Sequence, residues 1–232
     1  MPVHIPMVIA HRGASAAHPE NTVAAFVGAR DAGADGVELD ARRTADGHVI
    51  VHHDAQLPDG RVIVDLEAAE LPDHVPSLAE ALDASAGMIV NIEIKNWPDD
   101  PDFDGTEQVA AQVVDLVSST GWRDDVLVSS FHLPTVDRVR ELDGGLATAF
   151  LHIRIDGPTA LAQALEHGHG ALHPWDPFVS ADLVARAHEL GIKVNTWTVD
   201  DPDRMLELAG FGIDGIVTNV PDLARETLGS RP

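Results

Sequence analysis

The sequence predicts an α/β protein built as a single (β/α)₈ barrel, with a β-hairpin extension after the second strand. Its 232 residues are close to the roughly 250 that one such barrel needs. Short apolar segments alternate with amphipathic segments along the whole chain. The apolar segments are mostly continuous, as strands covered on both faces require. We therefore expect one domain spanning residues 1–232, without a linker.

Eight apolar segments are candidates for the barrel strands. In chain order they are 7–11, 36–41, 88–95, 126–131, 147–152, 171–175, 193–199 and 215–219. Helices are expected between them, and six have recognisable starts or apolar faces: 22–32, 78–84, the stretch 109–117, 180–191, 203–208 and 221–228. Ser77 and Glu80 form a capping box before the second of these helices.

A ninth strand candidate, residues 48–53, follows the second strand closely. A parallel crossover needs a dozen or more residues, so this segment cannot be the next barrel strand. Asp46-Gly47 is a hairpin turn signal, and we expect an antiparallel hairpin centred on that pair. In this register Asp40 lies opposite His53, on the same face as Glu38.

Composition excludes several classes of partner and cofactor. The chain has no cysteine, so disulfides and thiolate metal ligands are ruled out. A formal net charge of −23 repels nucleic acid and anionic membranes. We see no signal peptide and no apolar run long enough to span a membrane, so we expect a cytoplasmic protein. An anionic substrate would need local positive charge from a few residues or from a bound cation.

Functional residues of an α/β barrel lie at the C-terminal ends of its strands. Glu38 and Asp40 stand two apart and project from one face of a strand, and Glu93 alternates with apolar neighbours and also points inward. Three carboxylates at one rim repel one another unless a proton or a cation is shared among them. All-oxygen ligands select Mg²⁺ or Ca²⁺, or else Mn²⁺, rather than zinc. A single strand glutamate could instead form an ordinary ion pair.

Two histidines and two cationic side chains accompany these carboxylates. His11 and His53 each end a predicted strand, and two imidazoles can act as general base and general acid. Cleavage of a phosphodiester needs that pairing, because the nucleophile loses a proton and the leaving alkoxide gains one. Arg12 would offer a forked donor to phosphoryl oxygens, and Lys95 a point charge. Both could also simply neutralise the carboxylates.

The chain resembles the glycerophosphodiester phosphodiesterases, whose short motifs occur here in the family's order along nearly the whole chain. The motifs are His11-Arg12-Gly13, Pro19-Glu20-Asn21-Thr22, Val37-Glu38-Leu39-Asp40, Thr44-x-Asp46-Gly47, His53-Asp54, Ile92-Glu93-Ile94-Lys95, Ser130-Phe131, His173-Pro174, Trp197-Thr198-Val199 and Asp214-Gly215-Ile216-Val217-Thr218. Each motif alone is weak evidence, whereas the ordered series is very specific.

The resemblance implies a TIM barrel that hydrolyses glycerophosphodiesters to sn-glycerol 3-phosphate and an alcohol with the help of a divalent metal. It implies these roles: metal ligands Glu38, Asp40 and Glu93; catalytic histidines His11 and His53; phosphate- or metal-proximal cations Arg12 and Lys95; and a pocket-lining aromatic residue, Trp197. The chain departs from the family after His53-Asp54, where the segment up to Glu93 is short. We expect a more open pocket there, and this segment helps to choose the alcohol.

Two other functions are compatible with the sequence. One is a lysophospholipase D-like or other phosphodiesterase on the same barrel, which would use the same residues. No amphipathic helix has an exposed apolar face with a basic rim, which argues against action at a membrane. The other is a non-catalytic barrel that binds a phosphorylated metabolite, although no histidine or carboxylate of the motifs is missing. His173 and Asn195 could either line the pocket or pack in the core. The sequence does not indicate the oligomeric state, the head group or the division of roles between the histidines.

Overall fold

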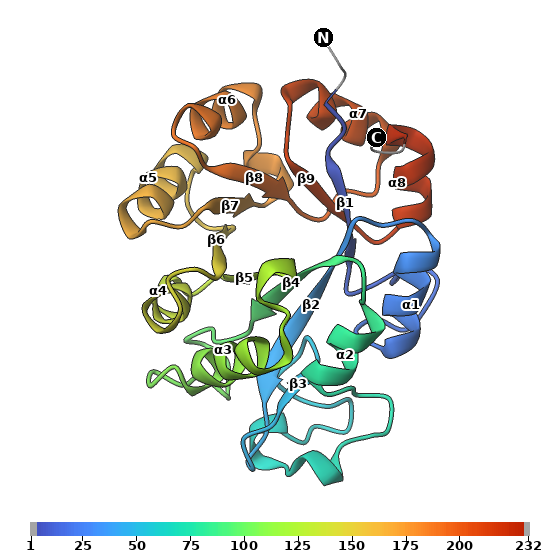
Figure 1. Ribbon diagram of the computed structural model, residues 1–232, viewed down its shortest axis with the longest axis vertical. Helices are drawn as coiled ribbons and strands as arrows, with labels where there is room; N and C mark the ends of the chain where they lie inside the picture. The colour runs from blue at the N-terminus through green and yellow to red at the C-terminus, as the bar shows by residue number, and fades with distance from the viewer. Residues whose placement is uncertain (1–3, 230–232) are drawn as a thin grey trace.

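Eight parallel strands close into a ring in the computed structural model, which describes residues 4–229 (Figure 1). The first and last three residues of the expected 1–232 domain lie outside the described residues. The ring strands are β1 (Met7–His11), β2 (Gly36–Arg43), β4 (Ile89–Ile94), β5 (Val126–Ser130), β6 (Ala147–His152), β7 (Ala171–Pro174), β8 (Lys193–Thr196) and β9 (Gly215–Thr218). Strand β1 pairs with both β2 and β9 and so closes the barrel.

Helices surround this ring on the outside (Figure 1). They are α1 (Val23–Asp31), α2 (Leu78–Ala84), α3 (Gln108–Thr120), α4 (Leu133–Leu142), α5 (Gly157–His167), α6 (Ala181–Glu189), α7 (Pro202–Phe211) and α8 (Pro221–Leu228). Short 3₁₀ turns are η1 (Ile63–Asp65), η2 (Ala68–Glu70), η3 (Arg123–Asp125) and η4 (Asp176–Phe178). The (β/α)₈ barrel that the sequence predicts is therefore confirmed, including the hairpin strand β3 (Val49–Val51) bonded to β2 outside the ring.

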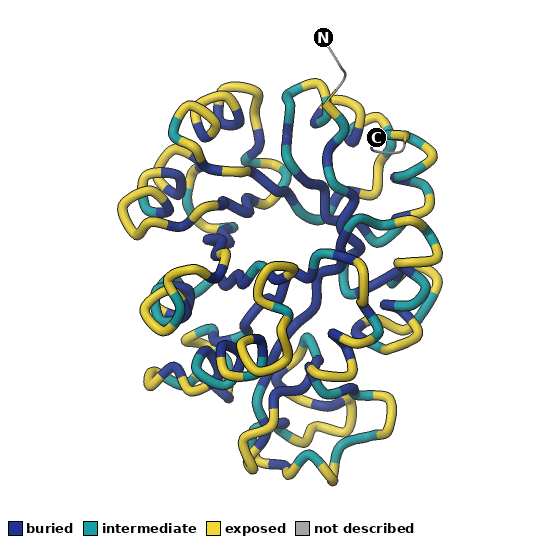
Figure 2. Tube along the Cα trace, viewed as in Figure 1, coloured by how far each residue is buried: buried dark blue, intermediate teal, exposed yellow. Residues whose placement is uncertain are grey.

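The strands form the buried centre of the molecule, as Figure 2 shows. On β2 the apolar residues Val37, Leu39 and Ala41 belong to a core cluster shared with the surrounding helices. Because side chains alternate along a strand, Glu38 and Asp40 point the other way, into the barrel. Both faces of β2 are thus buried, which explains why its polar residues stand inside an apolar run.

The register of the hairpin differs by one residue from the predicted one. Ala41 pairs with Val51, and the His52 backbone N–H donates to the Asp40 carbonyl at 2.9 Å. His52, not His53, therefore lies opposite Asp40. The loop causes the difference: three residues separate Thr44 from His48, and Gly47 has φ 82°, the left-handed position of a three-residue hairpin loop. Asp46-Gly47 is consequently not the centre of a two-residue turn.

The segment after the hairpin packs on a small apolar cluster of its own. Ile50, Leu57, Ile63 and Leu66 form this cluster, next to β3 in the lower part of Figure 1. The chain leaves the ladder after Val51, so the position of the following histidines depends on how this segment packs. The segment is held beside the rim of the barrel rather than within its core.

The polar, Pro-rich loop of residues 97–105 is anchored by one buried arginine on β2. Arg42 is 4% exposed, and its Nη1 atom donates to both carboxylate oxygens of Asp102 at 2.8 and 2.6 Å. It also donates to Asp100 at 3.0 Å and, through Nε, to the His53 carbonyl at 2.8 Å. One guanidinium therefore joins the loop, β2 and the segment that carries His53.

We expect Arg42→Met to lower the free energy of unfolding by about 3–5 kcal/mol, because it leaves the buried Asp102 carboxylate without its partner. Urea unfolding monitored by circular dichroism measures this change. The neighbouring Arg43→Met is the matched control: Arg43 is only half-buried and its Nε atom lies 3.9 Å from Asp104, so a loss of about 1 kcal/mol or less is expected. The double variant Arg42→Met/Asp102→Leu should recover most of the loss. Equal stability of the single variant and the parent chain would contradict the anchoring role.

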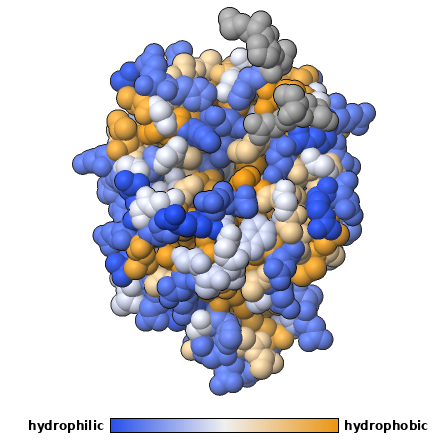
Figure 3. All heavy atoms as spheres, in the orientation of Figure 1, coloured by the Kyte–Doolittle hydropathy of each residue, from blue (hydrophilic) through white to orange (hydrophobic). Residues whose placement is uncertain are grey.

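No helix within residues 4–229 is long and apolar enough to cross a membrane. On the face shown in Figure 3, hydrophobic and hydrophilic side chains are interspersed.

Candidate active site

Parallel pairing of β2 with β4 brings the three predicted carboxylates together. Asp40 is the register partner of Glu93, and Glu38 lies one inward-facing position below Asp40. The three side chains each offer an oxygen within 4.8 Å of the others, and the residues are 4%, 0% and 7% exposed. The prediction that these three side chains point into the barrel and lie close together is therefore confirmed. Such a buried cluster needs positive charge or protons to be stable.

Two cationic side chains supply part of that charge. Lys95 Nζ lies 2.9 Å from Asp40 Oδ1 and also pairs with Glu93. Arg12 Nε lies 3.2 Å from Asp40 Oδ2. Although burial alone would raise it, these two cations hold the pKa of Asp40 below its ordinary range. Asp40 and Glu93 in turn outweigh burial and raise the pKa of Lys95.

Glu38 is the carboxylate that lacks a balancing partner. Its Oε2 atom accepts a hydrogen bond from the Arg12 backbone N–H at 3.0 Å, whereas its buried Oε1 atom has no partner. Burial and the nearby charges of Asp40 and Glu93 raise the pKa of Glu38 well above its ordinary value. Burial also raises the pKa of Glu93. An unpartnered buried oxygen within a set of three carboxylates fits a divalent cation with a preference for oxygen ligands.

His11 is held in one orientation by a chain of hydrogen bonds. Asn219 donates through Nδ2 to Asp200 at 2.7 Å, so its Oδ1 atom must accept, and it faces His11 Nδ1 at 2.7 Å. His11 therefore carries its hydrogen on Nδ1 and leaves the Nε2 lone pair free. The Nε2 atom lies 3.9 Å from Glu38 Oε2. Burial, with a smaller contribution from Arg12, lowers the pKa of His11 below its ordinary value.

His53 has the same arrangement with a different partner. Its Nδ1 atom lies 2.7 Å from the Asp54 carboxylate, which can only accept, so Nε2 is again free. Burial and the charge of Lys95 lower the pKa of His53. The side chain is 37% exposed, compared with 20% for His11. Despite the shifted register, His53 lies close enough to Asp40 to contribute, after Lys95 and Arg12, to the lowered pKa of that carboxyl.

Aromatic side chains line the cleft beside these groups. Trp197 packs edge-to-face on Phe131 with ring centroids 5.4 Å apart, and Phe131 packs in the same way on Trp97 at 5.9 Å. The Arg154 guanidinium lies over the Trp97 ring, 4.7 Å from its centroid. A cleft of about 280 Å³ runs between Lys95, Trp97, Phe131 and Arg154 and reaches His53. A larger hollow of about 630 Å³ also borders His53, along residues 52–58.

His173 lines a small cavity at the inner end of the barrel mouth, and Asn195 is buried and packs against it. Asn195 Nδ2 faces His173 Nε2 at 3.0 Å, and His173 shares a small cavity with His11, Glu38 and Trp197. Complete burial lowers the pKa of His173 to about 3. Its imidazole is therefore neutral at ordinary pH and lines the same small cavity as Glu38 and Glu93.

Several residues outside the predicted set orient the site. Asn21 is buried and donates to Asp40 Oδ2 at 2.7 Å. Asn219 and Asp200 hold His11, and Asp54 holds His53. Asn21 lies within the Pro-Glu-Asn-Thr motif and could have been found there. Asn219 follows the last strand, 208 residues from His11 in the chain, and only barrel closure reveals the contact.

The fold is that of a TIM barrel with carboxylates, imidazoles and cationic side chains gathered at its mouth, an arrangement typical of TIM-barrel enzymes. The sequence profile of the glycerophosphoryl diester phosphodiesterase family matches residues 11–223. The chain belongs to this family of phosphoric diester hydrolases.

Individual relatives agree with this assignment. The chain is 30% identical to a glycerophosphodiester phosphodiesterase of Caldanaerobacter subterraneus subsp. tengcongensis over 241 residues, covering 93% of this chain and 95% of the relative. The structure of an Oleispira antarctica phosphodiesterase in complex with the product sn-glycerol-3-phosphate is similar with a TM-score of 0.86 and 27% identity, covering 97% of this chain and 98% of that one. The structure of a glycerophosphodiester phosphodiesterase from Thermotoga maritima has a TM-score of 0.83 and 27% identity, covering 96% of this chain and 98% of that one.

Proposed function

We propose that this chain, acting as one catalytic unit, hydrolyses glycerophosphodiesters to sn-glycerol 3-phosphate and an alcohol in a reaction that depends on a divalent metal. His11 and His53 serve as its general acid–base pair. The observation that carries the proposal is the buried, unpartnered oxygen of Glu38 beside Asp40, Glu93 and His11. The product bound by the Oleispira antarctica relative supports the choice of substrate.

Glu38, Asp40 and Glu93 are the proposed metal ligands. Their oxygen atoms suit Mg²⁺ or Ca²⁺, with Mn²⁺ as a further candidate. Such a cation, when bound, polarises a phosphoryl oxygen and offsets the charge that develops on it. It would also relieve the repulsion within the carboxylate cluster, which Lys95 and Arg12 only partly balance.

Arg12 and Lys95 are the proposed phosphate-side cations. The chain carries a net charge of −23, so an anionic diester is repelled by most of the surface. The two cations at the barrel mouth replace this repulsion with a local attraction for the anionic substrate. A preorganised guanidinium also stabilises phosphoryl oxygens through forked hydrogen bonds. Trp197 is the proposed aromatic wall of the same pocket.

The two histidines act through their Nε2 atoms, because each Nδ1 atom is committed to a neighbour. One imidazole removes the proton from the nucleophile, which is the glycerol 2-hydroxyl or water. The other imidazole donates a proton to the leaving alcohol. Deprotonation and protonation by positioned side chains each contribute about 10²–10⁴-fold to such reactions.

The test is release of glycerol 3-phosphate from glycerophosphocholine, glycerophosphoethanolamine and glycerophosphoglycerol, each with Mg²⁺, with Ca²⁺ and with chelator. We expect release that chelator abolishes. The Arg154 guanidinium already occupies the face of the Trp97 ring, where an aromatic side chain would otherwise bind the choline cation. We therefore expect glycerophosphocholine to react more slowly than glycerophosphoglycerol. Release that is unchanged by chelator would overturn the metal dependence. No release by folded, metal-loaded protein would favour a wider range of phosphodiesters or a binding role.

A further inference from the structure

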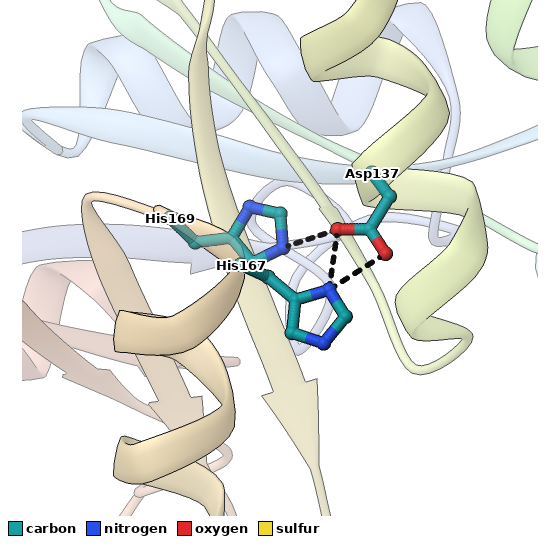
Figure 4. A group of neighbouring side chains, drawn as sticks. All are labelled: Asp137, His167 and His169. Atoms are coloured by element: carbon teal, nitrogen blue, oxygen red, sulfur yellow. Dashed lines mark hydrogen bonds and ion pairs between the residues drawn. The ribbon is translucent and has the colours of Figure 1, made fainter.

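A second cluster of metal-binding side chains lies far from the barrel mouth. Asp137 on α4, His167 at the end of α5 and His169 in the loop before β7 point toward one another (Figure 4). Thr148, which contacts His169, is near the start of β6. The cluster therefore lies toward the N-terminal end of the barrel strands, whereas the candidate active site is at their C-terminal ends.

An ordinary Asp–His hydrogen bond accounts for only part of this cluster. His167 Nδ1 faces the two Asp137 oxygens at 2.8 and 3.0 Å. His169 is different: its side chain is 0% exposed, and its Nε2 atom lies 3.2 Å from Asp137 Oδ1 yet makes no hydrogen bond. A buried ring nitrogen beside a carboxylate, without a hydrogen bond to it, requires an explanation.

The two separations from Asp137 Oδ1 to the histidine nitrogens are close to those between neighbouring ligand atoms in a metal coordination shell. Ligand atoms held at roughly 2.0–2.1 Å from a tetrahedral zinc ion lie about 3.3 Å apart. Asp137 Oδ1 lies 3.0 Å from His167 Nδ1 and 3.2 Å from His169 Nε2, and each of the three residues offers an atom within 4.8 Å of the others. A ring nitrogen that coordinates an ion points at the ion and not at the neighbouring ligand, which explains the poor alignment of His169 with Asp137.

The outer contacts of the cluster complete the pattern. His169 Nδ1 lies 3.0 Å from the Thr148 hydroxyl, the kind of contact that fixes the ring orientation of metal-ligating histidines. Asp137 and His167 are 29% and 36% exposed, so an ion can enter and a water can occupy a fourth position. The guanidinium of Arg140 packs against Gly168. Its positive charge would disfavour a cation bound by this cluster.

We propose that Asp137, His167 and His169 bind a Zn²⁺ ion that fastens α4 to the loop between α5 and β7. Two imidazoles and one carboxylate favour a borderline transition-metal ion over Mg²⁺ or Ca²⁺. The ion is separate from any metal at Glu38, Asp40 and Glu93, whose ligands are all oxygen. Its role is structural, because it joins two elements on the face of the barrel that is associated with stability rather than catalysis.

The test is isothermal titration of ZnCl₂ into the protein in excess Mg²⁺, with Co²⁺ absorption and imidazole NMR as spectroscopic readouts. We expect one zinc ion per chain, with coordination through His167 Nδ1 and His169 Nε2. His167→Ala should weaken binding by about 100-fold through loss of a ligand, and Thr148→Val by about 10-fold through loss of orientation. Arg140→Ala should tighten binding by up to about 5-fold.

His188→Ala is the matched control. His188 also pairs with an aspartate, at 2.8 Å from Asp214, but within residues 4–229 it belongs to no group of three metal-binding side chains. His188→Ala should keep the zinc affinity of the parent chain, and zinc should raise the Tm of the parent chain and of His188→Ala alike. The proposal is overturned if the parent chain and His167→Ala bind zinc equally, or if neither binds it in the presence of Mg²⁺.

Discussion

Glu38→Gln is expected to lower metal-dependent hydrolysis strongly while making the metal-free protein more stable. The oxygen that Glu38 turns into the carboxylate cluster is buried and unpartnered, and Asp40 and Glu93 repel it. Glutamine keeps the side-chain shape and can still accept the Arg12 backbone hydrogen bond. Removal of the uncompensated charge should raise the free energy of unfolding by about 2 kcal/mol, which for a chain of this size raises Tm by about 6 °C.

Activity should fall in the same variant by about 1,000-fold, because a bound cation contributes several kcal/mol to stabilisation of the transition state. Thermal unfolding with and without Mg²⁺ separates the two effects: the parent chain gains stability from the ion, and the variant does not. Glu189→Gln, on the exposed face of α6, controls for the general effect of removing one negative charge. Metal-dependent turnover near the parental rate in Glu38→Gln would show that Glu38 is not a ligand.

His11→Ala and His53→Ala are each expected to lower kcat by about 10²–10⁴-fold, the contribution of one general acid or base. Both variants should still bind the metal, because the carboxylate ligands are unchanged. If the two imidazoles act in one transition state, the double variant should lose less than the product of the single losses. Steady-state release of glycerol 3-phosphate measures the rates, and titration of Mg²⁺ or Ca²⁺ measures the metal affinity.

His52→Ala is the control that matches His53 in position and side-chain type. His52 Nδ1 faces the backbone carbonyl of Asp54 at 2.8 Å, and the His52 backbone N–H pairs with Asp40 in the ladder. Within residues 4–229 its side chain forms no hydrogen bond or ion pair with the carboxylate cluster, so we expect near-parental turnover. A large loss in His52→Ala with little loss in His53→Ala would exchange the two residues in the proposed mechanism.

The barrel and most of its strands follow from local patterns. Continuous apolar segments between amphipathic ones predict β1, β6 and the remaining ring strands because each strand is covered on both faces. The alternation along β2 and β4 likewise predicts that Glu38, Asp40 and Glu93 point into the barrel. These features depend on residues within a few positions of one another, so they can be predicted from the sequence alone.

The hairpin shows where local patterns stop being sufficient. Asp46-Gly47 marks a turn correctly, but the pair fits both a two-residue loop and the three-residue loop that is observed. The choice depends on packing outside the turn: the Ala45 N–H donates to the Leu66 carbonyl at 2.8 Å. His53 is then positioned by Arg42 and by the packing of its own segment rather than by strand register.

The sequence by itself determined the fold class, the family motifs and the identity of the inward-facing carboxylates, because strand periodicity encodes which side of the sheet a residue faces. Only the tertiary structure decided which partners hold those groups. The Asn219 contact that orients His11 and the meeting of Asp137 with His167 and His169 both join separate strand–helix units. Closure of the barrel brings the first and last units together, and pairing of successive strands brings neighbouring units together. Neither distance can be read from local sequence spacing.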